Sequence, residues 1–156
     1  MNCKQEKYGY LLLIEDNKGK RIMQLTESVY SLGRSRQRTI LIDAKQVSRY
    51  HATLVRKKNP KTNYYNFFIV DGDLKGNKST NGLLVNGIYK ASHQLKHGDV
   101  VYLGYHSTYG EKTQLKYFQF LIETVQQLVQ SGPEIKESTI SKIMARKESY
   151  KDTMIA

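Results

Sequence analysis

Short strand-like segments, each followed by a turn signal, recur about every ten residues from Tyr8 to Ile122. They are rich in β-branched and aromatic residues, and several alternate between apolar and polar side chains, as half-buried strands do. Glycine, asparagine, aspartate and proline gather between them and favour turns. No long amphipathic helical pattern interrupts the series before Glu123. The pattern therefore predicts an all-β domain, most simply an antiparallel β-sandwich or barrel.

Nine segments have this strand-like character, and they cover residues 8–14, 20–25, 29–33, 39–42, 52–56, 64–70, 83–85, 100–103 and 115–122. We expect the first two to form a hairpin whose turn covers residues 15–19. A second hairpin is expected at Asn86-Gly87, because both residue types accept the positive φ angles of a tight two-residue turn. In the last segment, Phe118 and Phe120 should share one face of the strand.

The strand-like pattern ends at Ile122, and the residues that follow favour helices. The stretch from Thr124 to Gln127 is interpreted as a capping box that opens a short helix ending at Gly132. A second amphipathic helix is predicted from the helical spacing of Ile140, Ile143, Met144 and Lys147. We expect these helices either to pack on the sandwich or to fray, because the segment holds too little apolar surface to fold alone. The chain is thus divided into an N-terminal lead (1–7), a β-sandwich (8–122) and a helical or partly disordered C-terminal extension (123–156).

The formal net charge is +11, and the positive excess lies outside the extension. Residues 123–156 carry five Lys or Arg and five Asp or Glu, so the rest of the chain carries the whole excess. Between Gly33 and Lys58, Asp43 is the one acid among eight bases, which are Arg34, Arg36, Arg38, Lys45, Arg49, Arg56, Lys57 and Lys58. The positive electrostatic potential of these residues attracts phosphates of any kind, in phosphopeptides, nucleic acids or anionic lipids. Charge alone therefore does not distinguish among these ligands.

Several classes of protein are not expected. The single cysteine, Cys3, makes no internal disulfide and no zinc spacing, which favours a reducing, cytoplasmic location. No segment resembles a signal peptide or approaches the roughly 20 apolar residues of a membrane span. His93, His97 and His106 have no set of metal ligands around them, so no metal is expected. No phosphate-binding loop or dinucleotide fingerprint is present, so no cofactor is expected either.

Four short polar clusters follow strand-like segments. They are Gly33-Arg34, Ser48-Arg49-Tyr50-His51, Ser79-Thr80-Asn81-Gly82 and Asn86-Gly87. Together they offer an arginine fork for phosphate oxygens, small hydroxyl groups, and a carboxamide that can bond a peptide backbone. Each cluster alone is ordinary turn chemistry, so their joint occurrence carries the argument.

Catalysis is not expected at these clusters. A nucleophilic pair of Ser48 and His51 would need a third group to orient the histidine, and no such group stands at a recognisable spacing. The glycine-flanked serine of hydrolase elbows is also missing. We therefore expect a binding protein and not an enzyme.

The order and spacing of the clusters, within roughly Tyr8 to Ile122, resemble the forkhead-associated (FHA) domain. This resemblance implies a β-sandwich of about 11 strands that binds phosphothreonine peptides with the loops at one of its poles. It implies phosphate contacts from Arg34, Ser48 and Thr80 and a peptide-backbone contact from Asn81. Arg49, which follows the serine, would either add a second cation to the phosphate site or stay solvated. It assigns a supporting role to Gly33, His51, Gly82, Asn86 and Gly87. Gln46 is a departure, because some members carry a basic residue two positions before the serine.

The expected function is recognition of phosphothreonine in partner proteins, which would be kinase substrates or a kinase itself. Phosphorylation of Thr139 or Thr153 would let the C-terminal extension occupy its own site or that of a second copy, giving autoinhibition or self-association. Two alternatives stay open. One is a basic nucleic-acid-binding module, although a nucleic acid is a less expected partner than a phosphoprotein. The other is a scaffold of the same fold that binds nothing. No membrane partner is expected.

Overall fold

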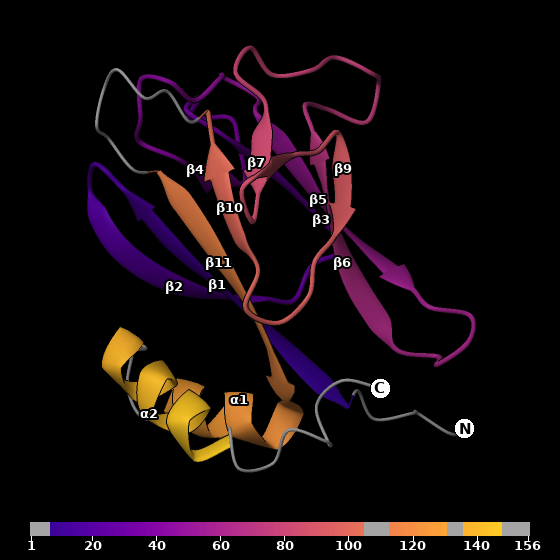
Figure 1. The fold of residues 1–156 in the computed structure, drawn as a ribbon, viewed down its shortest axis with the longest axis vertical. Coiled ribbons are helices and arrows are strands. Elements are labelled where there is room, and N and C mark those ends of the chain that lie inside the picture. The colour runs from indigo at the N-terminus through magenta and orange to yellow at the C-terminus, as the bar shows by residue number, and fades with distance from the viewer. Residues whose placement is uncertain (1–6, 105–112, 131–135, 148–156) are drawn as a thin grey trace.

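The computed structural model of the chain describes residues 7–104, 113–130 and 136–147 (Figure 1). In these residues, eleven strands form two sheets and two helices follow them. The prediction of an all-β sandwich of about 11 strands with a helical C-terminal part is thereby confirmed.

The larger sheet has six strands in the order β2-β1-β11-β10-β7-β8. Its members are β1 (Tyr8–Asp16), β2 (Gly19–Leu25), β7 (Leu83–Val85), β8 (Ile88–Tyr89), β10 (Val100–Leu103) and β11 (Gln114–Leu121). All neighbours are antiparallel. The first and last strands of the sandwich are thus paired at the centre of one sheet, with Tyr8 opposite Leu121.

The smaller sheet has five strands in the order β4-β3-β5-β6-β9. Its members are β3 (Val29–Gly33), β4 (Ile40–Leu41), β5 (Ala52–Lys58), β6 (Tyr65–Asp71) and β9 (Ser92–Gln94). The pairing of β3 with β4 is parallel, and the other pairs are antiparallel. Because β4 pairs with the last residues of β3, with Leu32 opposite Ile40, the loop between the two strands lies at the end of the sheet at which β3 ends.

Two strands and the length of the first turn were not predicted from the sequence. Strands β8 and β9 were not expected, because two or three half-exposed or exposed residues give no pattern of alternation. The first turn is shorter than expected, since β1 continues through Asp16. The buried Asp16 carboxylate accepts hydrogen bonds from Lys18 N, Arg21 Nη1 and Asp43 N at 2.9–3.0 Å, so an acid is satisfied inside the strand.

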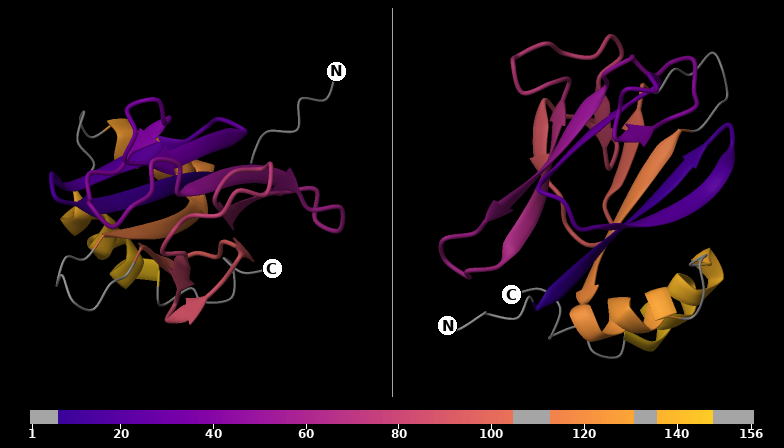
Figure 2. Two further views of the ribbon diagram at one scale, coloured as in Figure 1. Left: turned by 90° about the horizontal axis from the view of Figure 1, so that it is seen from above. Right: turned by 180° about the vertical axis from the view of Figure 1, so that it is seen from behind.

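Strands β1 and β11 are buried on both faces. Tyr10, Leu12 and Ile14 point into the core between the two sheets, while Leu11 and Leu13 point outward. The outward face is covered by helices α1 (Ile122–Gln130) and α2 (Glu137–Lys147), which lie beside these strands in Figures 1 and 2. Two-sided burial explains why the sequence of β1 is apolar at consecutive positions.

The outer cluster consists of Leu11, Leu13, Phe118, Phe120, Val125, Leu128 and Ile140. The predicted common face of Phe118 and Phe120 is therefore confirmed. Gly9 brings the helix close to the sheet, because a Cβ at this position would lie 2.6 Å from Val125 Cγ2. An exposed ion pair of 3.0 Å between Lys20 and Glu137 adds a contact from α2. The extension is packed on the sandwich where the structure describes it.

The predicted capping box at the start of the extension is wrong. Helix α1 begins at Ile122, so Thr124 lies inside its first turn. The backbone N–H of Ile122 donates to the Lys7 carbonyl at 2.9 Å, a tertiary contact that the sequence pattern does not reveal. Gly132 lies outside the described residues, as do the side chains of Ile143, Met144 and Lys147. The division of the chain into three parts stays a prediction.

Neither of the helices in the described residues is long and apolar enough to span a membrane.

Candidate functional site

Three loops meet at one end of the sandwich, at the top of Figure 1, and we call this end the loop pole. The loops cover residues 34–39, 42–51 and 72–82. Arg34 N donates to the Ser48 carbonyl at 3.1 Å, and Thr80 N donates to Ser48 Oγ at 3.0 Å. Asn81 Nδ2 donates to the Gln46 carbonyl at 2.9 Å. Clusters more than thirty residues apart in the sequence are thus joined around Ser48.

Gly33 is required by close contact between two segments of backbone. A Cβ at Gly33 would lie 2.1 Å from the carbonyl oxygen of Arg49 and 2.8 Å from that of Ser48. Its φ angle is not in the left-handed region, so conformational freedom is not the reason for the glycine. The missing side chain lets the loop that carries Ser48 cross directly against the end of β3.

His51 links two of the loops from a fully buried position. Ser48 N donates to its Nδ1 at 3.0 Å, so the ring proton is on Nε2, which donates to the Gly82 carbonyl at 2.8 Å. Burial lowers the pKa of His51, although the hydrogen bond to Gly82 and the charge of Asp71 oppose this. The imidazole is therefore neutral, and both of its nitrogens are occupied. Because both ring nitrogens of His51 bond backbone groups, neither is left to accept the Ser48 hydroxyl proton, and the two side chains form no nucleophile–base pair.

Ser79 and Asp71 hold the third loop, and the sequence analysis did not identify either as a support. Ser79 Oγ donates to Asp71 Oδ1 and accepts from Gly82 N at 2.9 Å, while Ser79 N donates to Asp71 Oδ1 at 3.2 Å. The turn places Gly82 at φ +78°, where a side chain is strained. The Gly82 carbonyl also accepts from Gly104 N at 3.2 Å. A carboxylate at a strand end, eight residues before a serine, is too weak a signal to find from the sequence.

Asn86 and Gly87 lie away from the loop pole, at the other end of β7. Their φ angles of 49° and 86° make the expected two-residue turn. Asn86 Nδ2 donates to Asp99 Oδ1 at 2.9 Å, and Asn86 Oδ1 accepts from Val100 N at 3.0 Å. Burial alone would raise the pKa of Asp99, but hydrogen bonds from Asn86, Lys96 N and His93 hold it below its usual value. This turn supports the sheet and does not touch the site.

Ser48 and Asn81 keep hydrogen-bonding capacity for a ligand. The hydroxyl of Ser48 accepts from Thr80 N, which leaves its own proton for donation. Asn81 uses one amide N–H on the Gln46 carbonyl, and no contact in the described chain uses its carbonyl oxygen. The side chain of Gln46 turns toward the start of β11, where Nε2 donates to Thr113 Oγ1 at 3.0 Å. Gln46 thus holds Asn81 with its backbone, and its side chain is engaged elsewhere.

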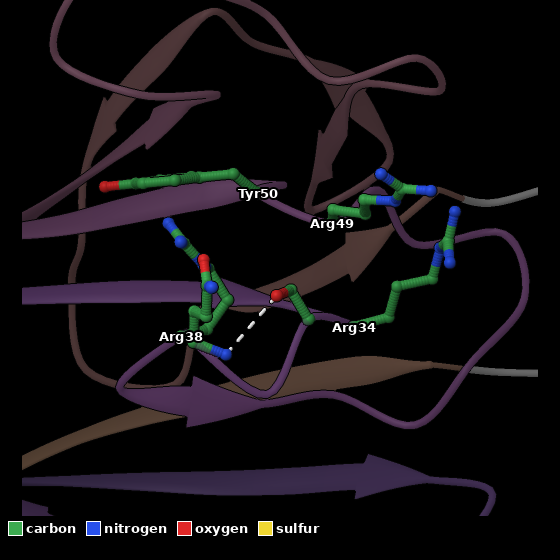
Figure 3. A pocket seen from close by; sticks show the side chains of 6 residues that line it. Arg34, Arg38, Arg49 and Tyr50 are labelled. Atoms are coloured by element: carbon green, nitrogen blue, oxygen red, sulfur yellow. Dashed lines mark hydrogen bonds between the residues drawn. The ribbon is translucent and has the colours of Figure 1, made fainter.

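Positive charge surrounds these groups. Arg34 and Arg49 are exposed, and neither has a carboxylate partner within the residues that the structure describes. They point toward each other beside a pocket of about 390 Å³, shown in Figure 3. The pocket is lined by Arg34, Ser35, Gln37, Arg38, Arg49 and Tyr50. Unpaired guanidinium groups next to hydroxyl donors attract an anion with several acceptor oxygens.

The described residues contain no group of His, Cys, Asp or Glu side chains that could hold a metal ion. A two-sheet sandwich with a cationic loop pole defines a class of small recognition modules. Within that class, the FHA domain model matches residues 30–104. The chain belongs to the FHA domain family, whose members are interaction modules, and the predicted family is confirmed.

Several relatives are similar to this chain. The crystal structure of the Slr1951 protein from Synechocystis sp. is 34% identical, with a TM-score of 0.60, over 72% of this chain and 97% of that one. The FhaA FHA domain, solved with the intracellular domain of Rv3910, is 26% identical, with a TM-score of 0.52, over 69% and 98%. A domain from a study of phosphothreonine-dependent FHA interactions is 25% identical, with a TM-score of 0.53, over 70% and 95%.

A curated relative is much longer than this chain. The uncharacterized protein sll1895 from Synechocystis sp. is 44% identical over 94 residues, which are 60% of this chain. The matched part is 13% of the length of sll1895.

Proposed function

We propose that the chain binds phosphothreonine in partner proteins through its loop pole. The observation that carries the proposal is the pair of exposed guanidinium groups of Arg34 and Arg49, which have no carboxylate partner among the described residues. They lie near Ser48, which is bonded to Thr80, and near Asn81, which is bonded to the Gln46 backbone. This arrangement stands in a fold that is shared with a domain studied for phosphothreonine-dependent interactions.

Each residue has a definite role in the proposal. Arg34 binds phosphate oxygens with its planar fork, and Arg49 adds a second positive charge. The hydroxyl groups of Ser48 and Thr80 donate to the same phosphate. Asn81 bonds the peptide backbone with its free carbonyl oxygen and its second amide proton. Because a phosphate adds roughly −1.5 to −2 charge and three acceptor oxygens, phosphorylation switches binding on.

Selectivity for threonine over serine would come from a small apolar slot for the γ-methyl group. Burial of one methyl group contributes on the order of 1 kcal/mol, or about fivefold in affinity. Equal affinity for matched phosphothreonine and phosphoserine peptides would disprove the slot.

The partners in this proposal are threonine-phosphorylated proteins in the cytoplasm, either kinase substrates or a kinase itself. The protein recognises them and does not transform them. Thr139 lies in α2, where its N–H donates to the Lys136 carbonyl at 2.9 Å, so self-association through phosphorylated Thr139 would require a kinase to reach this helix. Thr153 lies outside the described residues.

A nucleic acid is the rival ligand, on the ground of the net charge of +11. Binding that depends on many phosphates falls steeply as salt increases, whereas binding of one phosphopeptide involves few charges. Affinity for single-stranded and duplex nucleic acid, measured over a series of salt concentrations beside the peptide assay, separates the two ligands.

The test of the proposal is binding to degenerate phosphothreonine, phosphoserine and unphosphorylated peptide libraries at near-physiological salt. We expect phosphothreonine-selective binding that is lost in Arg34→Ala. Arg36→Ala is the matched control, because Arg36 is exposed on the same loop and does not line the pocket. Equal binding of all three libraries, or none by a protein shown to be folded, would refute the proposal. Deletion after Glu123 is not a clean control, since it would uncover Leu11, Leu13 and Phe118.

A further inference from the structure

The geometry points to a second anion-binding subsite, built on Arg38 and Tyr50 beside the proposed phosphothreonine site. Its ligand is a phosphate or carboxylate group carried by the same phosphopeptide, within a few residues of the phosphothreonine. The inference rests on the proposed function and adds to it a preference for peptides with a second negative group.

The subsite is the part of the pocket in Figure 3 that lies around Arg38 and Tyr50. It is lined by Arg38, Tyr50, Ser35 and Gln37, and it shares Arg34 and Arg49 with the proposed phosphate site. Ser48, Thr80 and Asn81 do not line it. The volume of the whole pocket, about 390 Å³, falls within the roughly 300–1,000 Å³ that is usual for ligand sites. There is room for a group of the peptide beyond the phosphothreonine itself.

Arg38 is held in place before any ligand arrives. Its guanidinium carbon lies 4.2 Å from the centre of the Tyr50 ring, and Figure 3 shows the side chain beneath that ring. The Tyr50 hydroxyl lies 3.1 Å from Thr53 Oγ1, and the buried Thr53 donates to the Gly72 carbonyl at 2.7 Å. Because this chain of contacts ends in backbone, the arginine loses little freedom when it binds.

The loop around Arg38 is equally ordered. Arg38 N donates to the Ser35 carbonyl at 3.0 Å, and Gln37 N donates to Ser35 Oγ at 3.3 Å. Ser35 N in turn donates to the Arg49 carbonyl at 3.3 Å, which ties this loop to the one that carries Tyr50. Both walls of the pocket are therefore fixed relative to each other.

Arg38 has no anionic partner in the described chain. Its Nε is shielded from solvent and makes no hydrogen bond there, so stacking on Tyr50 and not hydrogen bonding holds the group. The terminal nitrogens of the guanidinium remain for a ligand. A stacked arginine of this kind is suited to bind a phosphate or a carboxylate with two parallel hydrogen bonds.

The charges around the pocket favour a second anion over a single one. One phosphate brings roughly −1.5 to −2 charge, which Arg34 and Arg49 together balance. Arg38 contributes a further positive charge to the same pocket. With only a phosphothreonine bound, that charge would lack a partner.

The experiment measures affinities of a singly phosphorylated phosphothreonine peptide whose other residues are neutral. In two further series, one Asp or one phosphoserine is moved through about five positions on each side, a reach of roughly 17 Å in an extended chain. The protein is used as the full chain in wild-type, Arg38→Gln and Arg36→Gln forms, each checked for folding by thermal unfolding. The Asp and phosphoserine series distinguish a carboxylate from a phosphate.

We expect about tenfold tighter binding when the second anion stands at one or two adjacent positions on one side. This gain should be lost in Arg38→Gln and kept in Arg36→Gln, while the affinity for the neutral peptide stays nearly the same in all three proteins. Tyr50→Phe, which keeps the ring, should retain most of the gain, and Tyr50→Leu, which removes the stacking surface, should lose it.

The outcomes separate the inference from the proposed function. If the wild-type protein does not bind the neutral phosphothreonine peptide, the proposed function fails and the inference fails with it. If that peptide binds but no position of the second anion improves binding, only the subsite is refuted. A gain that survives both Arg38→Gln and Tyr50→Leu would also refute it, because the second anion would then be bound elsewhere.

Discussion

The loop pole has a floor and a rim that differ in their chemistry. The floor consists of Gly33, His51, Ser79 and Gly82, and the rim consists of Arg34 and Arg49. In the floor, a neutral imidazole and a hydroxyl group hold loop backbone with hydrogen bonds of about 3 Å, and a glycine lets backbone pass against backbone. The rim carries guanidinium groups that have no carboxylate partner in the described chain.

This difference teaches that one short sequence cluster can serve two separate purposes. Gly33 belongs to the floor and Arg34, the next residue, belongs to the rim. In the second cluster, Arg49 and His51 are divided in the same way. Changes at neighbouring positions should therefore alter different quantities: the free energy of unfolding for the floor, and the affinity for a phosphopeptide for the rim.

The largest effect is expected for Gly33→Ala. Since the new Cβ would lie 2.1 Å from the Arg49 carbonyl oxygen, backbone must move, and we expect a loss of at least about 3 kcal/mol in unfolding free energy. Denaturant unfolding measures it. Gly76→Ala is the control, because nothing lies near its Cβ and only its φ of +96° is unfavourable, which costs about 1–2 kcal/mol. Equal losses in both variants would contradict the close-contact explanation.

Arg34→Gln tests the rim. The backbone hydrogen bond from Arg34 N to Ser48 is kept, so the unfolding free energy should change by less than about 0.5 kcal/mol. The affinity for a phosphothreonine peptide should fall about 10- to 100-fold, as expected when a charge-assisted hydrogen bond is removed. Calorimetric titration and denaturant unfolding of the same preparation give both numbers. A large loss of stability would show that this residue belongs to the floor.

His51→Gln should destabilise the protein by about 2 kcal/mol, because a buried backbone donor or acceptor loses its partner. His51→Asn should be measured beside it, because each variant can replace a different ring nitrogen. The asparagine carbonyl can take the place of Nδ1 beside Ser48 N, and the longer glutamine amide can take the place of Nε2 beside the Gly82 carbonyl. If both variants are as stable as the wild-type protein, the two hydrogen bonds do not hold the loops together.

The dependence of stability on pH is the smallest effect. Burial lowers the pKa of His51 in the folded state below the ordinary value of 6.5. Below pH 6.5 the unfolded chain therefore binds a proton that the folded protein does not. The unfolding free energy should fall as the pH decreases from 7 through the folded-state pKa, and less steeply in His51→Gln. The measurement is made without peptide, since the phosphate itself titrates near pH 6. If the unfolding free energy falls equally with decreasing pH in the wild-type protein and in His51→Gln, then His51 is not the cause of the pH dependence.

The sequence predicted the strands that are long enough to show a pattern. Alternation and turn residues located nine of the eleven strands of the described chain, whereas β8 and β9 are too short and too exposed to alternate. The start of α1 was missed; at this point Ile122 N donates to the carbonyl of Lys7, which is distant in the sequence. Local patterns do not contain such information.

The candidate site shows the same limit. The order of the clusters indicated that Ser48, Thr80 and Asn81 belong together. In the structure Thr80 N bonds Ser48 Oγ, and Asn81 bonds the backbone of Gln46 in the loop that carries Ser48. Their roles in binding stay predictions. Arg38 could not be selected from a run of basic residues, because its position depends on stacking against Tyr50 from another loop. Asp71 was missed for a similar reason, since only its contact with Ser79 shows its part in the site.

The buried Nε2–H of His51 also makes the floor observable. A ring proton that is shielded from water and bonded to the Gly82 carbonyl exchanges slowly, and only when the loops separate. It should therefore give a resolved imidazole resonance in nuclear magnetic resonance spectra. The rate at which this signal disappears in deuterated water would report how often the two loops open, and how far a bound peptide keeps them closed.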